Sequence, residues 1–369
     1  MRTVDLTIES IAFGGKGVAR DNGKAVFVPF AIDGEVVRAE IVREKKQFAE
    51  AEIIELKTPS SYRAEPPCPY FGRCGGCTYQ HIDYEHQLAT KTRQVREVLQ
   101  RIGKMQAVPM RPIVPSPAFY GYRNRVTVHA ANGAIGYFRR DSHQLIDVER
   151  CPIAMEEVNR ELGDLRASKP VEGHYTLRAQ STPRVFSQTN DAVATALRDL
   201  VIEIVPVNQQ LLIDAYCGAG FFAKALLGKF ERVIGIDWDK FAIEEARKSA
   251  TEKEQYIAGD VADELAQLPV GRDFKASPAR TEPATLIVDP PAVGLSANTR
   301  DTILDLAPNT FVYVSCNPAT LARDLSILQT RFHIESITPL DMFPQTAEIE
   351  VVAHLQLAAS TESRLTGNC

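Results

Sequence analysis

The chain has 369 residues, 44% of them hydrophobic and 24% charged, which is the composition of a soluble globular protein with two or three domains. No uninterrupted apolar run approaches a membrane span, and the N-terminus has no signal-peptide core, so we expect a cytoplasmic protein. The net charge of −5 argues weakly against a nucleic-acid partner.

The charge is unevenly distributed along the chain. Residues 1–150 carry a net charge of +5, and the remaining residues carry −10. A polyanionic partner should therefore contact the first part, above all around residues 120–126 and 137–143, where arginines and aromatic residues alternate. On charge alone, an ordinary solvated surface is the favoured interpretation of an excess of this size.

Residues 1–57 contain short alternating segments separated by glycine-rich or polar breaks, which is typical of β-strands. Several short strands in so few residues predict a small closed barrel of the oligonucleotide-binding type. An SH3-like module would show almost the same pattern.

Residues 57–67 have the composition of a linker, and a cluster of cysteines follows them. A helix is predicted over 84–103, because Leu88, Val95, Leu99 and Ile102 form one apolar stripe that Gly103 ends. Residues 120–150 return to strand-like alternation, with a hairpin expected at Asn132-Gly133.

From about residue 184 onward, predicted strands and helices alternate. This alternation predicts an open, mostly parallel sheet covered by helices. The predicted strands lie at 210–216, 232–237, 282–289 and 310–315.

A glycine-containing turn joins the first of these strands to its helix. Gly218 and Gly220 allow a ligand to approach the backbone, and Asp237 ends the next strand, where a carboxylate can accept the hydroxyls of a ribose. The pattern fits a nicotinamide or flavin domain, a methyltransferase that binds S-adenosylmethionine, or a turn with packing value only. The sequence Asp289-Pro290-Pro291 after another apolar strand favours methyl transfer.

Three cysteines, Cys68, Cys74 and Cys77, lie within ten residues and are interspersed with glycines. Thiolates at this spacing predict an iron–sulfur cluster or a structural zinc ion, and Cys151 is the best fourth ligand because proline follows it, as it follows Cys68. Spacing alone does not separate the cluster from zinc.

Cys316 stands where an apolar strand ends and a helix begins. Asn317 is a good N-cap and Pro318 a good first-turn residue, so the thiol should lie near a helix N-terminus, which favours the nucleophilic thiolate. A buried cysteine with a structural role is the alternative.

Taken together, these segments resemble the RNA uracil-C5 methyltransferases that carry an N-terminal TRAM domain and an iron–sulfur cluster, of the type that modifies 23S ribosomal RNA. The resemblance covers nearly the whole chain in the same order. It rests on residues 15–35, the segment Cys68–Cys77 with Cys151, FSQTN (186–190), DAYCGAGFF (214–222), VDPP (288–291), SCNPATLARDL (315–325) and DMFPQTAEIEVVAHL (341–355).

The resemblance implies a multi-domain fold. Residues 1–58 would form an OB-like TRAM barrel that binds RNA. Residues 59–183 would form a central α+β domain that holds a cluster on four cysteines, with the helix at 85–111 packed on the catalytic domain. Residues 184–369 would form an α/β Rossmann-like methyltransferase domain that depends on S-adenosylmethionine.

The resemblance also implies roles for individual residues. Cys316 would be the nucleophile and Glu350 the general base, and Asp289 would hold the uracil edge. Ala292 and Glu348 depart from the family pattern, which usually has arginine and histidine there. The implied cofactor-binding residues are Gln188, Asp214, Tyr216, Gly218, Gly220, Asp237, Asp260 and Asp289, and the implied cluster ligands are Cys68, Cys74, Cys77 and Cys151.

The implied activity is methylation of C5 of a specific uridine in RNA through a covalent cysteine–C6 adduct. The expected cofactors are S-adenosylmethionine and a [4Fe–4S] cluster, in preference to zinc. The expected partner is ribosomal RNA, with the tRNA T-loop as the alternative, and the protein is expected to be a monomer. An iron–sulfur oxidoreductase that uses a dinucleotide and an RNA-binding protein without activity are the rival interpretations.

Overall fold

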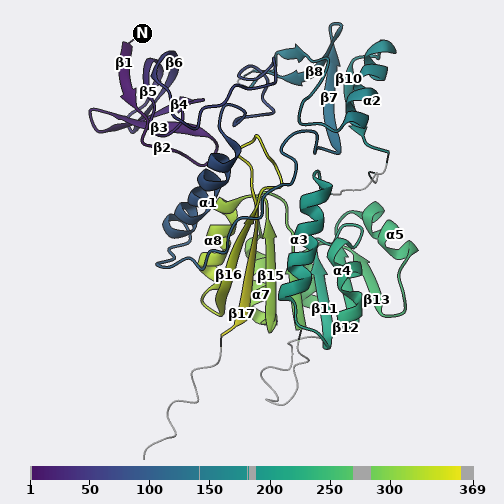
Figure 1. Ribbon diagram of the computed structural model, residues 1–369. Helices are drawn as coiled ribbons and strands as arrows, with labels where there is room; N and C mark the ends of the chain where they lie inside the picture. The colour runs from purple at the N-terminus through teal and green to yellow at the C-terminus, as the bar shows by residue number, and fades with distance from the viewer. Residues whose placement is uncertain (1, 141, 181, 183–187, 269–283, 359–369) are drawn as a thin grey trace, which may run out of the picture.

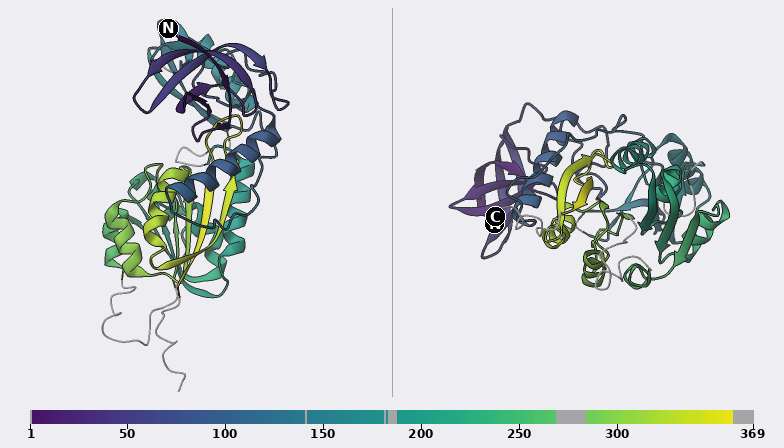
Figure 2. Two further views of the ribbon diagram at one scale, coloured as in Figure 1. Left: turned by 90° about the vertical axis from the view of Figure 1, so that its left-hand side faces the viewer. Right: turned by 90° about the horizontal axis from the view of Figure 1, so that it is seen from below.

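The computed structural model describes residues 2–140, 142–180, 182, 188–268 and 284–358. Three sheets follow one another along the chain, and the long helix α1 (Tyr84–Arg101) lies between the N-terminal sheet and the C-terminal one (Figures 1 and 2). None of the helices in these ranges is long and apolar enough to cross a membrane.

The N-terminal sheet has six strands in the order β1-β5-β6-β4-β3-β2. Alternate side chains point into one core, among them Val26 and Val28 of β4 and Val37 and Ala39 of β5. The pairings in this part of the chain leave β1 and β2 as edges, so closure of the predicted barrel stays a prediction. The strands are β1 (Arg2–Thr7), β2 (Ser10–Ile11), β3 (Lys16–Asp21), β4 (Lys24–Pro29), β5 (Val36–Glu44) and β6 (Phe48–Thr58).

A second sheet of four strands follows, with α2 (Glu156–Ala167) packed on it. The predicted hairpin is confirmed, because Asn132 and Gly133 both have positive φ, 51° and 77°, and join two antiparallel strands. The strands, in spatial order, are β10 (Gly173–Arg178), β7 (Arg125–Ala131), β8 (Ala134–Phe138) and β9 (Leu145–Asp147).

The C-terminal sheet has seven strands in the order β13-β12-β11-β14-β15-β17-β16. The first five of these are parallel, and β17 runs antiparallel between β15 and β16. Their bounds are β11 (Gln209–Ala215), β12 (Phe230–Asp237), β13 (Glu254–Ala258), β14 (Ala284–Val288), β15 (Thr310–Ser315), β16 (Phe332–Leu340) and β17 (Glu350–Leu357).

Helices cover both faces of this sheet, which confirms the predicted alternation (Figure 1). One face packs against α1, α6 (Val261–Gln267), α7 (Ala297–Leu306) and α8 (Pro318–Leu328). The other face packs against α3 (Asp191–Ile204), α4 (Phe221–Leu226) and α5 (Lys240–Lys248). Helix α4 after the glycine turn is short, because a 3₁₀ turn (Leu227–Lys229) follows it and Phe230 already begins β12.

Helix α1 is shorter than the predicted helix at 85–111. It begins at the N-cap Asp83 and ends at Arg101, and residues 102–111 follow without helix. Val95, Val98 and Leu99 lie in the same core as the C-terminal sheet and α8, so the helix packs on the sheet that carries the glycine turn.

A buried ion pair joins α1 to the segment that leads into β17. The ammonium of Lys91 lies 2.5 Å from Oδ1 of Asp341, and both side chains are 0% exposed. The hydroxyl of Tyr84 donates to the other oxygen of Asp341 at 2.9 Å, and Lys91 also donates to the carbonyl of Phe343. These contacts fix the loop before Glu350 onto α1.

The variant Lys91→Met should lower the free energy of unfolding by about 3–5 kcal/mol, because it leaves the Asp341 carboxylate buried without its counter-charge. Urea unfolding followed by circular dichroism measures the change. The exposed pair Arg150–Glu156 provides the control: Arg150→Met should leave the unfolding curve unchanged. If the urea unfolding curves of the two variants were the same, the buried pair would not be what holds the loop.

Candidate active site at the carboxyl edge of the sheet

The parallel strands of the C-terminal sheet end at one edge, and polar side chains gather there. Asp214 lies near the end of β11, Asp237 ends β12, and Asp289 directly follows β14. Cys316 directly follows β15, and Glu350 begins β17. The edge therefore brings together four carboxyl groups and one thiol that the sequence places far apart.

The direction of β17 explains why Glu350 belongs to this group. Ser315 at the end of β15 pairs with Val351 at the start of the antiparallel β17. The residues next to this pair, Cys316 and Glu350, therefore extend to the same edge of the sheet. Glu350 is only 2% exposed, and its Oε1 has no hydrogen-bond partner within the described structure.

The glycine turn after β11 lies beside these carboxyl groups. Gly218 and Gly220 have φ of 54° and 87°, a backbone region that glycine adopts without strain. A side chain at Gly220 would come within 2.8 Å of the Tyr256 hydroxyl, whereas a side chain at Gly218 would meet no atom within 4 Å. The open side of the turn thus faces space in which a ligand could lie against the backbone.

Two aspartates hold this turn in place. Oδ2 of Asp214 accepts a hydrogen bond from the backbone of Ala223 in α4, and Oδ2 of Asp237 accepts one from Gly218 at 2.8 Å. The second oxygen of Asp214 has no partner among the described atoms. Both predicted cofactor residues therefore shape the turn itself, whatever else they bind.

Burial and neighbouring negative charge raise the pKa values of three of these carboxyl groups. Burial, with the charges of Asp289 and Asp237, raises the pKa of Asp214 to about 8. Burial and the charge of Asp237 raise the pKa of Asp289 to about 7. Burial, with Asp289 and Glu348, holds the pKa of Glu350 well above its usual range. A bound cation would relieve this crowding of negative charge.

The prediction that Cys316 is a thiolate is wrong for the protein without a ligand. Burial, followed by the charges of Glu350 and Asp289, raises the pKa of Cys316 to about 12. The predicted helix start is confirmed, since the Asn317 side chain caps α8 and Pro318 opens it. Burial and the nearby carboxyl groups therefore outweigh the helix N-terminus.

Two further contacts connect the loop after Asp289 with the helix after Cys316. The backbone carbonyl of Ala292 accepts hydrogen bonds from the side chains of Asn317 and Thr320. These contacts are made by the backbone and not by the side chain of residue 292. The loop is therefore held in place although alanine stands where the family usually has arginine. Glu348 is exposed and adds negative charge near Glu350.

The sequence analysis missed Asp324, which lies in α8 and is 0% exposed. Its carboxylate accepts hydrogen bonds from the backbone of Leu295, the hydroxyl of Tyr313 and the guanidinium of Arg300. It thereby ties α8 to the loop after Asp289. The sequence did contain one indication of this role, because an aspartate on the apolar face of a predicted helix is expected to have a buried partner.

Three other predicted cofactor residues lie nearby but differ in setting. Tyr216 has a φ of 63°, which is rare for a bulky residue and re-aims the chain after β11. Asp260 caps α6, with Oδ1 accepting from both Ala262 and Asp263. Gln188 lies just before α3, and its backbone carbonyl accepts from Asn124.

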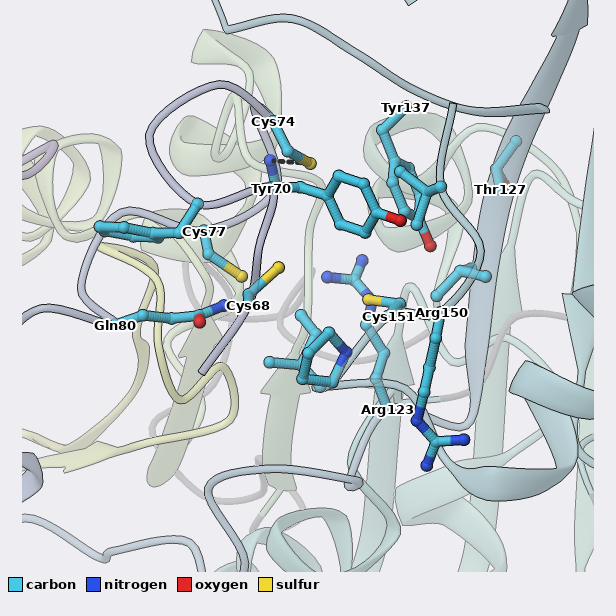
Figure 3. Close-up of a pocket in the computed structure, with 16 residues that line it drawn as sticks. Cys68, Tyr70, Cys74, Cys77, Gln80, Arg123, Thr127, Tyr137, Arg150 and Cys151 are labelled. Carbon is cyan, nitrogen blue, oxygen red and sulfur yellow. Dashed lines mark hydrogen bonds between the residues drawn. The ribbon is translucent and has the colours of Figure 1, made fainter. Parts of the chain in front are cut away.

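The four predicted ligand cysteines line one cavity of about 260 Å³ away from the sheet edge (Figure 3). Burial raises the pKa values of Cys68 and Cys74, and raises that of Cys77 to about 12. No three His, Cys, Asp or Glu side chains within the described ranges are placed to hold a single metal ion. The cavity thus brings the cysteines together without the tight convergence that one ion requires.

Comparisons with known proteins decide the family. The sequence model described as tRNA (uracil-5-)-methyltransferase matches residues 166–357, and that of the TRAM domain matches residues 1–54. An uncharacterized RNA methyltransferase from Bdellovibrio bacteriovorus is 33% identical over 96% of this chain and 95% of its own length. The chain belongs to the RNA uracil-5-methyltransferase family.

Two further similarities extend over nearly the whole chain. An uncharacterized RNA methyltransferase from Aquifex aeolicus is 30% identical and covers 96% of this chain and 99% of its own length. The tRNA (uracil-54, C5)-methyltransferase of Pyrococcus abyssi, solved with S-adenosyl-L-homocysteine, superposes with a TM-score of 0.70. It shares 24% identity over 95% of this chain and 100% of its own, so it shows the fold.

Family membership settles two of the earlier interpretations. The N-terminal sheet is a TRAM domain, and the C-terminal sheet with its helices is a methyltransferase fold. A dinucleotide-dependent oxidoreductase is no longer needed to explain the glycine turn. The protein is an enzyme of RNA methylation.

Alkylation of Cys316 by iodoacetamide should be slow at pH 8 and still rise beyond pH 10, because its raised pKa leaves little thiolate. Mass spectrometry of the peptide that contains Cys316 gives the rate. Glu350→Gln should shift the profile to lower pH, and Glu348→Gln should shift it less, because Glu350 raises this pKa more than Glu348 does. A wild-type alkylation rate that levels off near pH 8 would contradict a raised pKa of Cys316.

Proposed function

We propose that this enzyme transfers a methyl group from S-adenosylmethionine to C5 of a uridine in RNA, with Cys316 as nucleophile and Glu350 as base. The observation that carries the proposal is the adjacency of the two residues across the β15–β17 pair, beside the glycine turn. A nucleophile and a proton acceptor on neighbouring strand ends are what an addition–elimination reaction at one ring requires.

The acidic edge suits a positively charged methyl donor. S-adenosylmethionine supplies an electrophilic methyl group on a sulfonium cation. Asp237 and the open side of Gly218 would hold its nucleoside, assisted by Gln188, Tyr216, Gly220 and Asp260. The positive charge would offset the carboxyl groups that raise the pKa of Cys316, so the thiolate would form when the donor is bound.

The chain's own residues can then complete the reaction. The thiolate of Cys316 adds to C6 of the uracil, and the ring electrons move to C5, which takes the methyl group as the sulfonium S–CH3 bond breaks and S-adenosylhomocysteine leaves. Glu350 removes the proton from C5, the C6–S bond breaks, and the double bond returns. A buried carboxylate with a raised pKa and an unpartnered oxygen is suited to accept this proton. Asp289 would hold the polar edge of the base.

We also propose that Cys68, Cys74, Cys77 and Cys151 hold a [4Fe–4S] cluster. In such a cluster each iron binds one thiolate, so the four sulfurs surround a compact body and stand farther apart than around one ion. Four cysteines that line one cavity provide the number of thiolates that such a cluster requires. The cluster would join the Cys68–Cys77 loop to the segment that precedes α2.

The proposed RNA is the large-subunit ribosomal RNA, because the resemblance that includes the four cysteines is to enzymes of that type. The uridine of the tRNA T-loop is the second candidate. The description of the matching family as acting on tRNA and the fold of the Pyrococcus abyssi enzyme both favour it.

The variant Cys316→Ala should abolish transfer of labelled methyl groups into RNA, because it removes the thiol that adds to C6. Binding of S-adenosylmethionine, measured by calorimetry, should stay close to wild type. Ser326→Ala, on the helix that follows Cys316, is the matched control and should keep full activity. Residual methyl transfer by Cys316→Ala would contradict the mechanism.

Protein purified without oxygen should contain about four irons per chain, which metal analysis measures. Cys74→Ser should lose most of the iron, whereas Cys217→Ala, a cysteine of the glycine turn, should retain it. One zinc ion per chain in place of iron would contradict the cluster.

Mapping of 5-methyluridine in RNA from a deletion strain decides the substrate. We expect one position of 23S ribosomal RNA to lose its methyl group while the tRNA T-loop keeps its own. Loss from the T-loop alone would assign the enzyme to tRNA.

A further inference from the structure

A second cavity of about 370 Å³ lies between the TRAM domain and the loop that carries three of the ligand cysteines. Arginine guanidinium groups and apolar side chains line it together, with Glu52 as the only acidic residue of the lining. The chain as a whole has a charge of −5, so this concentration of arginine is local. The arginines are Arg63, Arg73, Arg139 and Arg140, and the apolar residues are Pro29, Phe30, Ile53 and Leu56.

Arg63 forms an ion pair with a buried carboxylate. Arg63 donates two hydrogen bonds to the carboxylate of the buried Glu35 in a bidentate contact, at 2.6 and 2.7 Å, and also donates to the carbonyl of Phe30. The charge of Arg63 is therefore balanced. Arg73 and Arg139 are exposed, and no carboxylate contacts either of them in the described ion pairs. The side chains of Arg73 and Arg139 are therefore accessible to a ligand in the cavity.

The cysteine loop places these two arginines side by side. Cys74 and Arg139 pair as an isolated antiparallel bridge, and the backbone of Arg140 donates to the carbonyl of Arg73 at 3.2 Å. The backbone of Gly75 donates to Phe138 at the end of β8. The arginines thus come from two segments that the Cys68–Cys77 loop holds against each other.

Phe30 forms an aromatic wall of the cavity. It has a φ of 60°, a strained conformation for a bulky residue, and such strain concentrates at binding sites. The guanidinium of Arg140 lies 4.4 Å from the centre of its ring, and Phe71 packs against its edge. A flat, partly charged surface of this kind suits a nucleotide base.

We propose that this cavity binds one nucleotide of the RNA substrate, outside the active site. The phosphate contacts Arg73 and Arg139, and the base lies against Phe30, Ile53 and Leu56. The inference rests on the proposed function for the identity of the RNA, but it names a separate site. An acidic protein segment would use the arginines and leave the apolar wall without a role, so a nucleotide fits the lining better.

The test uses the full-length enzyme and a fluorescein-labelled oligouridine of 12 nucleotides. Fluorescence anisotropy measures the affinity at several salt concentrations. The double variant Arg73→Gln/Arg139→Gln should bind about tenfold more weakly, because both arginine contacts to the phosphate are lost. The slope of log affinity against log salt should become shallower by about 0.7, because one phosphate of single-stranded RNA is no longer neutralised.

The matched control is Arg160→Gln/Arg198→Gln, which removes the same charge from α2 and α3, outside the cavity. It should keep the wild-type affinity and slope. Equal weakening by both double variants would show a general charge effect and overturn the proposal. Unchanged RNA binding by the cavity variant, with loss of binding to a polyglutamate peptide, would assign the cavity to a protein partner and also overturn it.

Methyl transfer separates this proposal from the proposed function. The cavity variant should raise the KM for RNA and leave kcat at saturating RNA near the wild-type value. Cys316→Ala should do the reverse, with no turnover and unchanged affinity for the oligouridine. A cavity variant that lowers kcat at wild-type affinity would contradict a remote binding site.

Discussion

The reversed direction of β17 is the constraint on which the active site depends. Every other strand next to the site is parallel and contributes its last residues to the edge. Only an antiparallel strand can bring its first residue there, and the register of Ser315 with Val351 places Glu350 beside Cys316. The buried Lys91–Asp341 pair then fixes the loop that carries the chain into β17.

The same edge has an electrostatic cost that gives it a function. Asp214, Asp289 and Glu350 have raised pKa values at this edge, and burial with the charges of Glu350 and Asp289 raises the pKa of Cys316. A cationic donor would lower this energy and release the thiolate in one event. Cys316, the proposed nucleophile, would thus be protected from other reagents until the donor is present.

Much of the fold could be predicted from the sequence, because period-two and helical patterns are local. The hairpin at Asn132-Gly133 and the strand ending at Ser315 agree with the structure. Contacts that join distant segments were not predictable, as for Asp324 and for Lys91 with Asp341. The state of Cys316 was mispredicted for the same reason, since the opposing carboxyl groups come from other strands.

The most direct test of the central claim is the Glu350→Gln enzyme mixed with S-adenosylmethionine and substrate RNA. Without the base, the C5 proton stays in place and elimination cannot occur. We predict an RNA–protein adduct that survives a denaturing gel, with a methylated uridine linked to the peptide containing Cys316. The absence of an adduct, or a link to any other residue, would contradict the roles of Cys316 and Glu350.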